Sequence, residues 1–223
     1  EGGTAYDTSG NGNDGTLTNM ATSTNGGWTR GKVGSALEFD GVDDYVDLGT
    51  QMSSYITDNA GSISMWIKAD NIDGSNHYLF SQDGSGAHNP SLYIKSDFRL
   101  QGDSSLDTSS IQAGEWYHVV ATWDSSGPDY IYVNLNSWSG DIGSFTPSRE
   151  ATIGIYHNES TAPFNGLIDQ VRIYDYARTP AQVAWEYNKG KPVAHWRMDE
   201  GDGSSVHDDS GNDNHGTLHL GSS

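Results

Sequence analysis

The sequence predicts an all-β protein built as a sandwich of two antiparallel sheets, with one short helix near its C-terminal end. Strand-like segments recur at short spacing between Gly, Asp, Asn and Ser turns, which is typical of a β-sandwich. Only 34% of the residues are apolar, yet 7 Trp, 12 Tyr and 5 Phe supply large side chains for a thin core. Many strands followed by a single late helix exclude an alternating α/β fold. The 223 residues fit one β-rich domain of roughly 200 residues and a tail.

The expected strands follow from alternation and from apolar runs. In chain order they lie at 36–39, 45–48, 62–68, 78–80, 91–94, 98–100, 116–123, 129–134 and 170–174. In 62–68 the alternation places Ile63, Met65 and Ile67 on one face. The segment 116–123 is the longest apolar run, and we expect it to be a central strand.

One helix is expected, over residues 180–187. Thr179 has the side chain of a good N-cap, and Pro180 suits the first helical position because its missing N–H is not needed there. Gly190 lies just past the expected end, where glycine is common.

The end of the chain repeats its beginning. Residues 208–218 match residues 7–17 at eight of eleven positions, and each copy follows a Glu-Gly pair. An expected strand, 193–198, precedes the second copy, and the first copy has no counterpart for it. Self-similarity of this kind indicates a repeated unit, here the size of a whole domain.

Five segments in this order resemble the laminin-G-like (concanavalin A-like) jelly-roll domains of secreted and surface proteins. They are residues 7–17, 34–46, 62–67, 114–120 and 166–174. The resemblance implies a jelly-roll sandwich over 1–191 that lacks its usual first strand. It implies that 192–223 hold a strand and a loop that repeat the start of a domain. This fold hosts lectins, adhesion modules, glycan-binding appendages and hydrolases, so it leaves the function open.

Calcium is the expected cofactor. The net charge of −19 comes from 23 Asp against 7 Glu, and Asp is a residue of turns and calcium sites. The loop 7–15 offers Asp7, Asn11 and Asn13 on a glycine-rich backbone. The resemblance implies that Asp169, and with it Asp40, completes the site. The alternative is that turns favour Asn, Asp and Gly without any ion.

Asp43 and Asp44 form a second acidic pair. Adjacent carboxylates beside a strand point to opposite faces, which favours a plain turn over a shared ion.

Two tryptophans are candidates for sugar binding. Trp28 and Trp138 are expected in polar loops, where an aromatic ring can stack on a sugar; the alternative is that they cap an end of the sandwich. Tyr156 and His157 in another polar loop are candidates of the same kind. The tryptophans expected in the core are Trp66, Trp116 and Trp123.

The sequence gives little support for catalysis. Concanavalin-like glucanases carry a Glu-x-Asp-x-x-Glu pattern on one strand, and the chain has no such run. It has no Cys, so a thiol nucleophile is excluded, while a Ser-His-Asp triad stays open. The strong negative charge disfavours nucleic acid and anionic membranes as partners. No apolar run approaches the ~20 residues of a membrane span.

The strand expected at 193–198 is a candidate link between domains or subunits. Its residues Val193, Ala194, Trp196 and Met198 are mostly apolar, and the last three lie on one face. The strand could complete its own domain, insert into a neighbouring molecule, or begin the next domain of a tandem array.

The sequence therefore predicts a non-catalytic, extracellular structural or adhesion repeat of a surface protein or filament, stabilised by calcium. Its partners would be neighbouring copies of the same domain, in tandem or head to tail. The alternative is a carbohydrate-binding, lectin-like module whose loop aromatics contact glycans.

Overall fold

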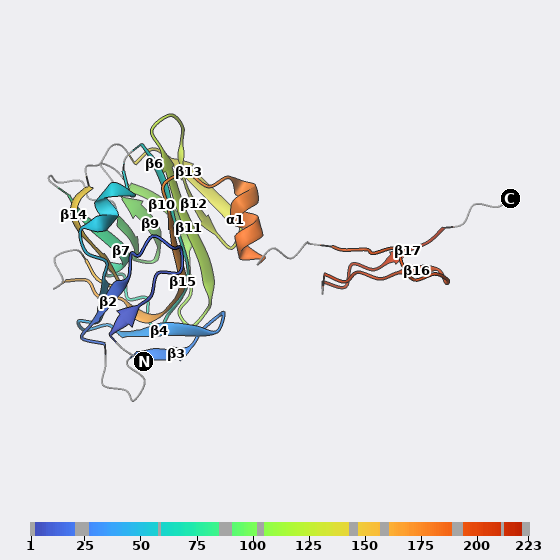
Figure 1. The fold of residues 1–223 in the computed structure, drawn as a ribbon, viewed down its shortest axis with the longest axis horizontal. Coiled ribbons are helices and arrows are strands. Elements are labelled where there is room, and N and C mark those ends of the chain that lie inside the picture. Colours follow the sequence, from blue (N-terminus) through green and yellow to red (C-terminus); the bar gives the residue numbers. More distant parts are fainter. Residues whose placement is uncertain are drawn as a thin grey trace. The chain divides into compact units, whose positions relative to one another are not determined.

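In the computed structural model the chain divides into two compact units, Glu1–Arg178 and Thr179–Ser223. The structure describes residues 3–20, 27–57, 59–84, 91–101, 105–142, 147–156, 161–188, 194–210 and 212–219. The first unit is a sandwich of two antiparallel sheets (Figure 1). The predicted fold class is thereby confirmed.

The first sheet has eight strands in the order β1-β2-β5-β14-β7-β8-β9-β10. Their bounds are β1 Thr4–Ala5, β2 Gly15–Thr18, β5 Tyr45–Asp47, β14 Pro147–Ile153, β7 His77–Gly84, β8 Ser91–Ile94, β9 Asp97–Gln101 and β10 Ser105–Ser110. β1 is one edge of this sheet and β10 is the other. A 3-10 helix, η1, covers Gln51–Ser54.

The second sheet has seven strands in the order β13-β12-β11-β6-β15-β4-β3. Their bounds are β13 Asn136–Gly140, β12 Asp129–Val133, β11 Tyr117–Asp124, β6 Ala60–Ala69, β15 Asn165–Tyr174, β4 Ser35–Asp40 and β3 Trp28–Arg30. β11, the longest apolar run, pairs with β12 on one side and β6 on the other, so its interior position is confirmed.

The core lies between the two sheets and follows the alternation of the strands. Ile63, Met65 and Ile67 on β6 are all buried in one apolar cluster, as predicted. Trp123 joins the same cluster beside Gly61, where any β-carbon would collide with the indole ring. Trp66 is also buried, but on the opposite face of β6, where Lys32 Nζ lies 4.6 Å from its ring. Its neighbour across the strands is His118, with ring centroids 5.1 Å apart.

The nine strands predicted between residues 36 and 174 are present, with ends shifted by a few residues. Sequence patterns missed six strands of the sandwich, several of them short or polar: β1, β2, β3, β10, β13 and β14. β10, for example, reads Ser-Leu-Asp-Thr-Ser-Ser and buries only Leu106. A strand with one apolar contact has too weak an alternation to be found from the sequence.

The second unit begins with helix α1, Pro180–Tyr187, which has the predicted bounds. Thr179 caps it as expected: Gln182 N donates to Thr179 Oγ1, and Thr179 N donates to Gln182 Oε1, a capping box. Among the described residues, no helix is long and apolar enough to cross a membrane.

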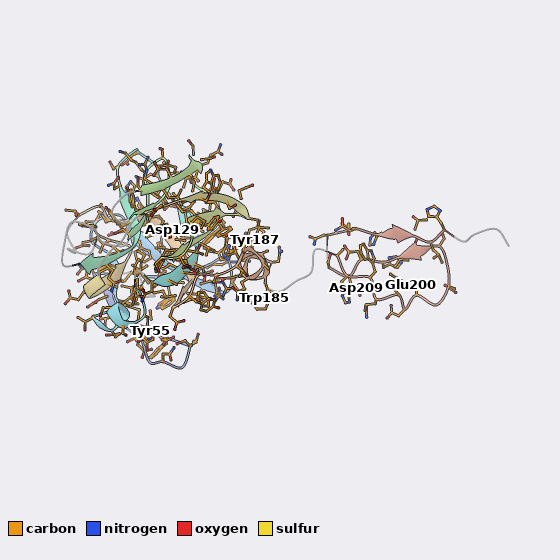
Figure 2. The ribbon with its side chains drawn as sticks, turned by 90° about the horizontal axis from the view of Figure 1, so that it is seen from above. Tyr55, Asp129, Trp185, Tyr187, Glu200 and Asp209 are labelled. Carbon is orange, nitrogen blue, oxygen red and sulfur yellow. The ribbon has the colours of Figure 1, made fainter. Side chains whose placement is uncertain are left out.

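The rest of this unit is a small hairpin with a segment laid against it. The hairpin pairs β16, Ser205–Val206, with β17, Gly216–Thr217. In place of the predicted strand 193–198 there is a single β-bridge between Trp196 and Asp208, and Val193 lies outside the described residues. Figure 2 shows Glu200 and Asp209 in this part of the chain. Whether 192–223 begins a further repeat stays a prediction.

Candidate functional site

The outer face of the eight-stranded sheet carries a line of aromatic and charged side chains, which we call the tyrosine row. Its members are Tyr156, Tyr78, Tyr93, Arg99 and Asp107. Tyr78 on β7 pairs with Tyr93 on β8. Tyr93 also pairs with Arg99 on β9, and Arg99 pairs in turn with Asp107 on β10. Side chains at directly paired positions lie on the same face, so four neighbouring strands place these groups side by side. Tyr156 follows β14 and joins the row at its Tyr78 end.

Strand periodicity explains why the row faces away from the core. Leu92 and Ile94, on either side of Tyr93, are 0% exposed and belong to the core cluster. Phe98 beside Arg99 belongs to the same cluster. Because successive side chains point to opposite faces, Tyr93 and Arg99 must lie on the outer face.

The three tyrosines are in contact with one another. The ring centroids of Tyr78 and Tyr93 are 4.9 Å apart, with planes at 27°, which is a stacked pair. Tyr156 packs on the other side of Tyr78 at 4.7 Å, tilted by 50°. Tyr78 and Tyr93 are nearly buried, at 8% and 6% exposure, whereas Tyr156 is half-buried. Tyr156 is therefore the accessible ring of the cluster.

The other end of the row is charged. Arg99 Nε lies 3.1 Å from Asp97 Oδ1, and Arg99 Nη1 lies 3.3 Å from Asp107 Oδ2. The two carboxylates hold the guanidinium in place, which fixes the direction of its remaining N–H groups. The side chain of Arg99 is 25% exposed and that of Asp107 is 41% exposed, so both reach solvent.

The hydroxyls of Tyr78 and Tyr93 are neutral at physiological pH, because their pKa values are raised. Burial raises the pKa of Tyr78 to about 12, and the neighbouring phenols of Tyr93 and Tyr156 add to this. Burial also raises the pKa of Tyr93, although the nearby Arg99 opposes the shift. Both phenols therefore stay protonated and can act as hydrogen-bond donors. The row combines ring faces, donors and carboxylate acceptors, which suits a ligand with apolar faces and several hydroxyl groups.

The structure corrects the placement of Trp28 and Trp138. Both lie in strands rather than loops, Trp28 in β3 and Trp138 in β13, and both are half-buried against the core cluster. β3 and β13 are the opposite edges of the seven-stranded sheet, so the two indoles do not form one platform. Of the other two candidates, Tyr156 belongs to the tyrosine row and His157 lies outside the described residues.

The residues predicted to share one calcium ion are placed in separate parts of the fold. Asp7 organises its own loop: its carboxylate accepts bonds from the amides of Ser9 and Asn13 at 2.7 and 2.9 Å. These bonds, led by that from Asn13, lower the pKa of Asp7. Asn11 donates its side-chain amide to Ser9 Oγ at 3.1 Å. Asp169 is buried, and its Oδ2 accepts the amide of Val33 at 2.8 Å.

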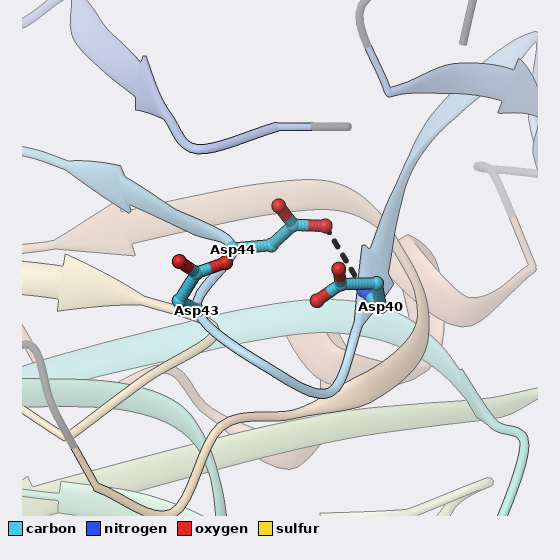
Figure 3. A group of neighbouring side chains, drawn as sticks. All are labelled: Asp40, Asp43 and Asp44. Atoms are coloured by element: carbon cyan, nitrogen blue, oxygen red, sulfur yellow. Dashed lines mark hydrogen bonds between the residues drawn. The ribbon is translucent and has the colours of Figure 1, made fainter. Parts of the chain in front are cut away.

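Asp40 instead meets Asp43 and Asp44 in the turn between β4 and β5. Among the described acidic and histidine side chains, these three form a group in which one carboxylate oxygen from each residue lies within 4.8 Å of the other two (Figure 3). The expectation that Asp43 and Asp44 point apart is therefore wrong. Residues 41–44 precede β5 and form a turn, in which Gly41 has φ of 76°, so the strand rule does not apply.

Asp44 is the unusual member of this acidic turn. Its Oδ2 accepts the amide of Asp40 at 3.0 Å, but its Oδ1 is buried without a hydrogen-bond partner. Burial raises the pKa of Asp44 from 3.8 to about 6, and the charges of Asp40 and Asp43 add to the shift. An oxygen ligand lies about 2.4 Å from a calcium ion, so two oxygens that bind the same ion are at most about 4.8 Å apart. The spacing of the Asp40, Asp43 and Asp44 oxygens therefore fits a hard divalent cation.

Sequence reasoning missed most of the tyrosine row. Tyr78, Tyr93 and Arg99 all fall in predicted strands, and the alternation of Tyr93 with core residues was an available signal. Tyr78 gives no such signal, because both Leu79 and Phe80 after it are core residues and the strand pairing shifts between Tyr78 and Phe80. Asp107 lies in β10, which was not predicted. Finding the tyrosine row also required the order in which the strands pair, and local periodicity does not reveal that order.

A family model matches residues 40–184; it describes the concanavalin A-like lectin/glucanases superfamily. A search of curated proteins found no match.

Solved structures with the same fold include three different kinds of protein. Domain 4 of an extracellular arabinanase from Geobacillus stearothermophilus, in complex with arabinotriose, is 24% identical, with a TM-score of 0.58 over 70% of this chain and 78% of that one. The binding domain of Paraclostridial Mosquitocidal Protein 1 gives a TM-score of 0.61 at 14% identity, covering 85% of this chain and 53% of that one. Trypanosoma rangeli sialidase in complex with sialic acid gives 0.59 at 13% identity, covering 79% of this chain but only 30% of the sialidase. At these identities the likeness establishes the fold alone.

Proposed function

Because the chain belongs to the concanavalin A-like lectin/glucanase superfamily, we propose that it is a carbohydrate-binding module, without catalytic activity of its own, that works outside the cell. The superfamily contains both lectins and glucanases, so family membership leaves the choice between binding and catalysis to the site. An extracellular setting is supported by the arabinanase whose domain 4 has the same fold.

The observation that carries the proposal is the tyrosine row. Sugar rings present C–H faces that stack on aromatic rings, and Tyr156 is the accessible ring of a three-ring cluster. Sugar hydroxyls need directed donors and acceptors, and Arg99 and Asp107 reach solvent in a fixed arrangement. The likeness to an arabinanase domain solved with arabinotriose supports the same class of ligand.

The two carboxylates at the charged end of the row, Asp97 and Asp107, argue for binding without hydrolysis. Glycoside hydrolysis needs one carboxyl group to donate a proton and a second to act as nucleophile or base. Asp97 and Asp107 both engage the guanidinium of Arg99, so their oxygens lie on one cation rather than on two sides of a cleft. Their geometry serves to orient Arg99.

Glycan binding by matched variants tests the proposal. The full chain is screened on a glycan array, and the best ligand is titrated calorimetrically against wild type, Tyr156→Ala and Arg99→Gln. We expect each change to weaken binding about tenfold, the effect of roughly 1.4 kcal/mol. Tyr130→Ala is the control, because Tyr130 stacks on Tyr132 at 5.7 Å in the other sheet. Failure of the wild type to bind any glycan, or equal losses in all three variants, would refute the proposal.

We further propose that calcium stabilises the domain, at the acidic turn of Asp40, Asp43 and Asp44. The buried, unpartnered Oδ1 of Asp44 supports this, because a cation would satisfy it. When bound, the ion would supply charge neutralisation for three carboxylates and no chemistry. A role as a structural or adhesion repeat is the second proposed function, and it is supported by the duplication of residues 7–17 at residues 208–218.

A further inference from the structure

The charged end of the tyrosine row carries more negative than positive charge. Asp97 and Asp107 both contact Arg99, so two carboxylates face one guanidinium and one negative charge stays uncompensated. The three side chains differ in how far they reach solvent: that of Asp107 is 41% exposed, that of Arg99 is 25% exposed and that of Asp97 is 12% exposed. The most accessible charged group at this end of the row is therefore a carboxylate.

The guanidinium of Arg99 is already engaged by its own domain. Arginine holds a carboxylate ligand through two neighbouring nitrogens, either Nε with one Nη or the two Nη groups together. Asp97 Oδ1 lies 3.1 Å from Nε, and Asp107 Oδ2 lies 3.3 Å from Nη1. Each of these nitrogen pairs thus has a member that contacts a carboxylate of the protein. The N–H groups that remain can donate singly, which is what a hydroxyl group requires.

Tyr93 uses the charge of Arg99 as well. Burial raises the pKa of Tyr93, and the charge of Arg99 together with its hydrogen bond to the phenol opposes this rise. Burial also works against the charged form of Arg99 itself, but the bond to Asp97 and the charges of both aspartates raise its pKa. The positive charge of the row is thus balanced inside the domain, and the row offers a ligand hydrogen bonds rather than net positive charge.

A sugar hydroxyl and a sugar carboxylate meet different conditions at this end of the row. A hydroxyl can donate to Asp107 and can accept from Arg99, because it has both functions. A carboxylate has acceptors only, so it cannot bond to Asp107, and its own charge would lie beside a like charge. Removing that carboxylate from water costs free energy that an engaged guanidinium does not offset. The net charge of −19 over the whole chain adds repulsion at longer range.

We propose that the tyrosine row selects neutral oligosaccharides over those that carry carboxylate groups, such as uronic and sialic acids, and that Asp107 sets this selectivity. The inference rests on the proposed function, because it specifies the ligand of the same site. The two ends of the row then have different roles. The aromatic end stacks on the face of a sugar ring whatever its charge. The charged end, which reaches the edge strand β10, distinguishes sugars by their charge.

Matched sugar trimers test the selectivity. The trimers of glucose, galactose, mannose and arabinose are each compared with the same trimer in which a hydroxymethyl group is oxidised to a carboxylate. Calorimetry with the full chain at neutral pH gives the ratio of neutral to acidic affinity for each pair. Because both affinities come from one protein preparation, partial loss of folded protein cancels in the ratio. We expect a ratio of at least about ten for every pair whose neutral member binds, since like charges brought together at an interface weaken binding by that much or more.

Asp107→Asn tests the residue. Asparagine keeps the shape and an oxygen for Arg99 Nη1 but removes the negative charge, so the ratio should fall about tenfold. Asp175→Asn is the matched control. Asp175 is exposed and follows β15 in the other sheet, so its loss removes one charge from the chain without touching the row, and the ratio should stay at the wild-type value. Salt at about 1 M instead of about 0.1 M should also lower the wild-type ratio, because it screens charges that reach solvent.

The outcomes separate this inference from the proposed function. Equal affinity for both members of each pair, tighter binding of the acidic member, or a ratio that Asp107→Asn leaves unchanged would overturn the selectivity, while carbohydrate binding would stand. Binding to none of the trimers and to no glycan on the array would overturn both.

Discussion

Asp44→Asn in the acidic turn should stabilise the calcium-free protein at neutral pH, because it removes a buried negative charge. Asn has the same shape and can still accept the amide of Asp40, which Asp44 Oδ2 accepts at 3.0 Å. The added amide donor replaces an oxygen, Oδ1, that has no hydrogen-bond partner. The substitution therefore changes charge with little change in packing.

The size of the effect follows from the pKa of Asp44, which burial raises from 3.8 to about 6. A carboxyl group with a raised pKa in the folded state binds its proton more tightly there than in the unfolded chain. Its ionisation therefore destabilises the fold, with no penalty well below pH 3.8 and the full penalty above pH 6. At 1.36 kcal/mol per pKa unit, the penalty is about 1 kcal/mol near pH 4.5 and at most about 3 kcal/mol near pH 8.

Urea unfolding in the presence of a chelator, followed by tryptophan fluorescence, measures this difference. Wild type and Asp44→Asn are compared at both pH values, so that groups common to both proteins cancel. The advantage of the variant should grow by about 2 kcal/mol from pH 4.5 to pH 8. An advantage that is the same at both pH values, within about 0.5 kcal/mol, would show that the environment of Asp44 does not disfavour its charge.

Three further predictions concern calcium, a strand contact and the helix cap. Calcium at about a hundred times its dissociation constant should stabilise the wild type by about 2.7 kcal/mol, which is measured as a higher melting temperature. Asp40→Asn should remove most of this gain. A melting temperature of the wild type that calcium does not change would argue against the site. Gly166→Ala should cost at least about 3 kcal/mol in urea unfolding, because Gly166 has φ of 139° and its new β-carbon would overlap the carbonyl of Lys68. Gly127→Ala, with nothing within 4 Å, is its control and should cost under about 1 kcal/mol. Thr179→Ala should weaken the cap of α1 by about 1 kcal/mol and speed amide exchange in its first turn, whereas Thr179→Ser should not.

Sequence patterns predicted most of the fold because they follow from the burial and hydrogen bonding of residues that are neighbours in the chain. The alternation in β6 reflects burial of one face of a strand, and the Thr179–Pro180 pair reflects the unsatisfied N–H groups of a helix start. The same rules misplaced Trp28 and Trp138. Their neighbours are polar, so they read as loop residues, yet both pack on the core from edge strands.

The sequence by itself determined nine strands of the sandwich, the single helix and the duplication of one loop, since each depends on residues close together in the chain. Only the tertiary structure decided which side chains meet. The tyrosine row requires β7 to β10 to pair in one order, and the acidic turn requires a left-handed Gly41 that turns Asp43 and Asp44 toward Asp40. Such contacts depend on strand register and turn conformation, which are set by packing across the whole sandwich and leave no periodic trace in the sequence.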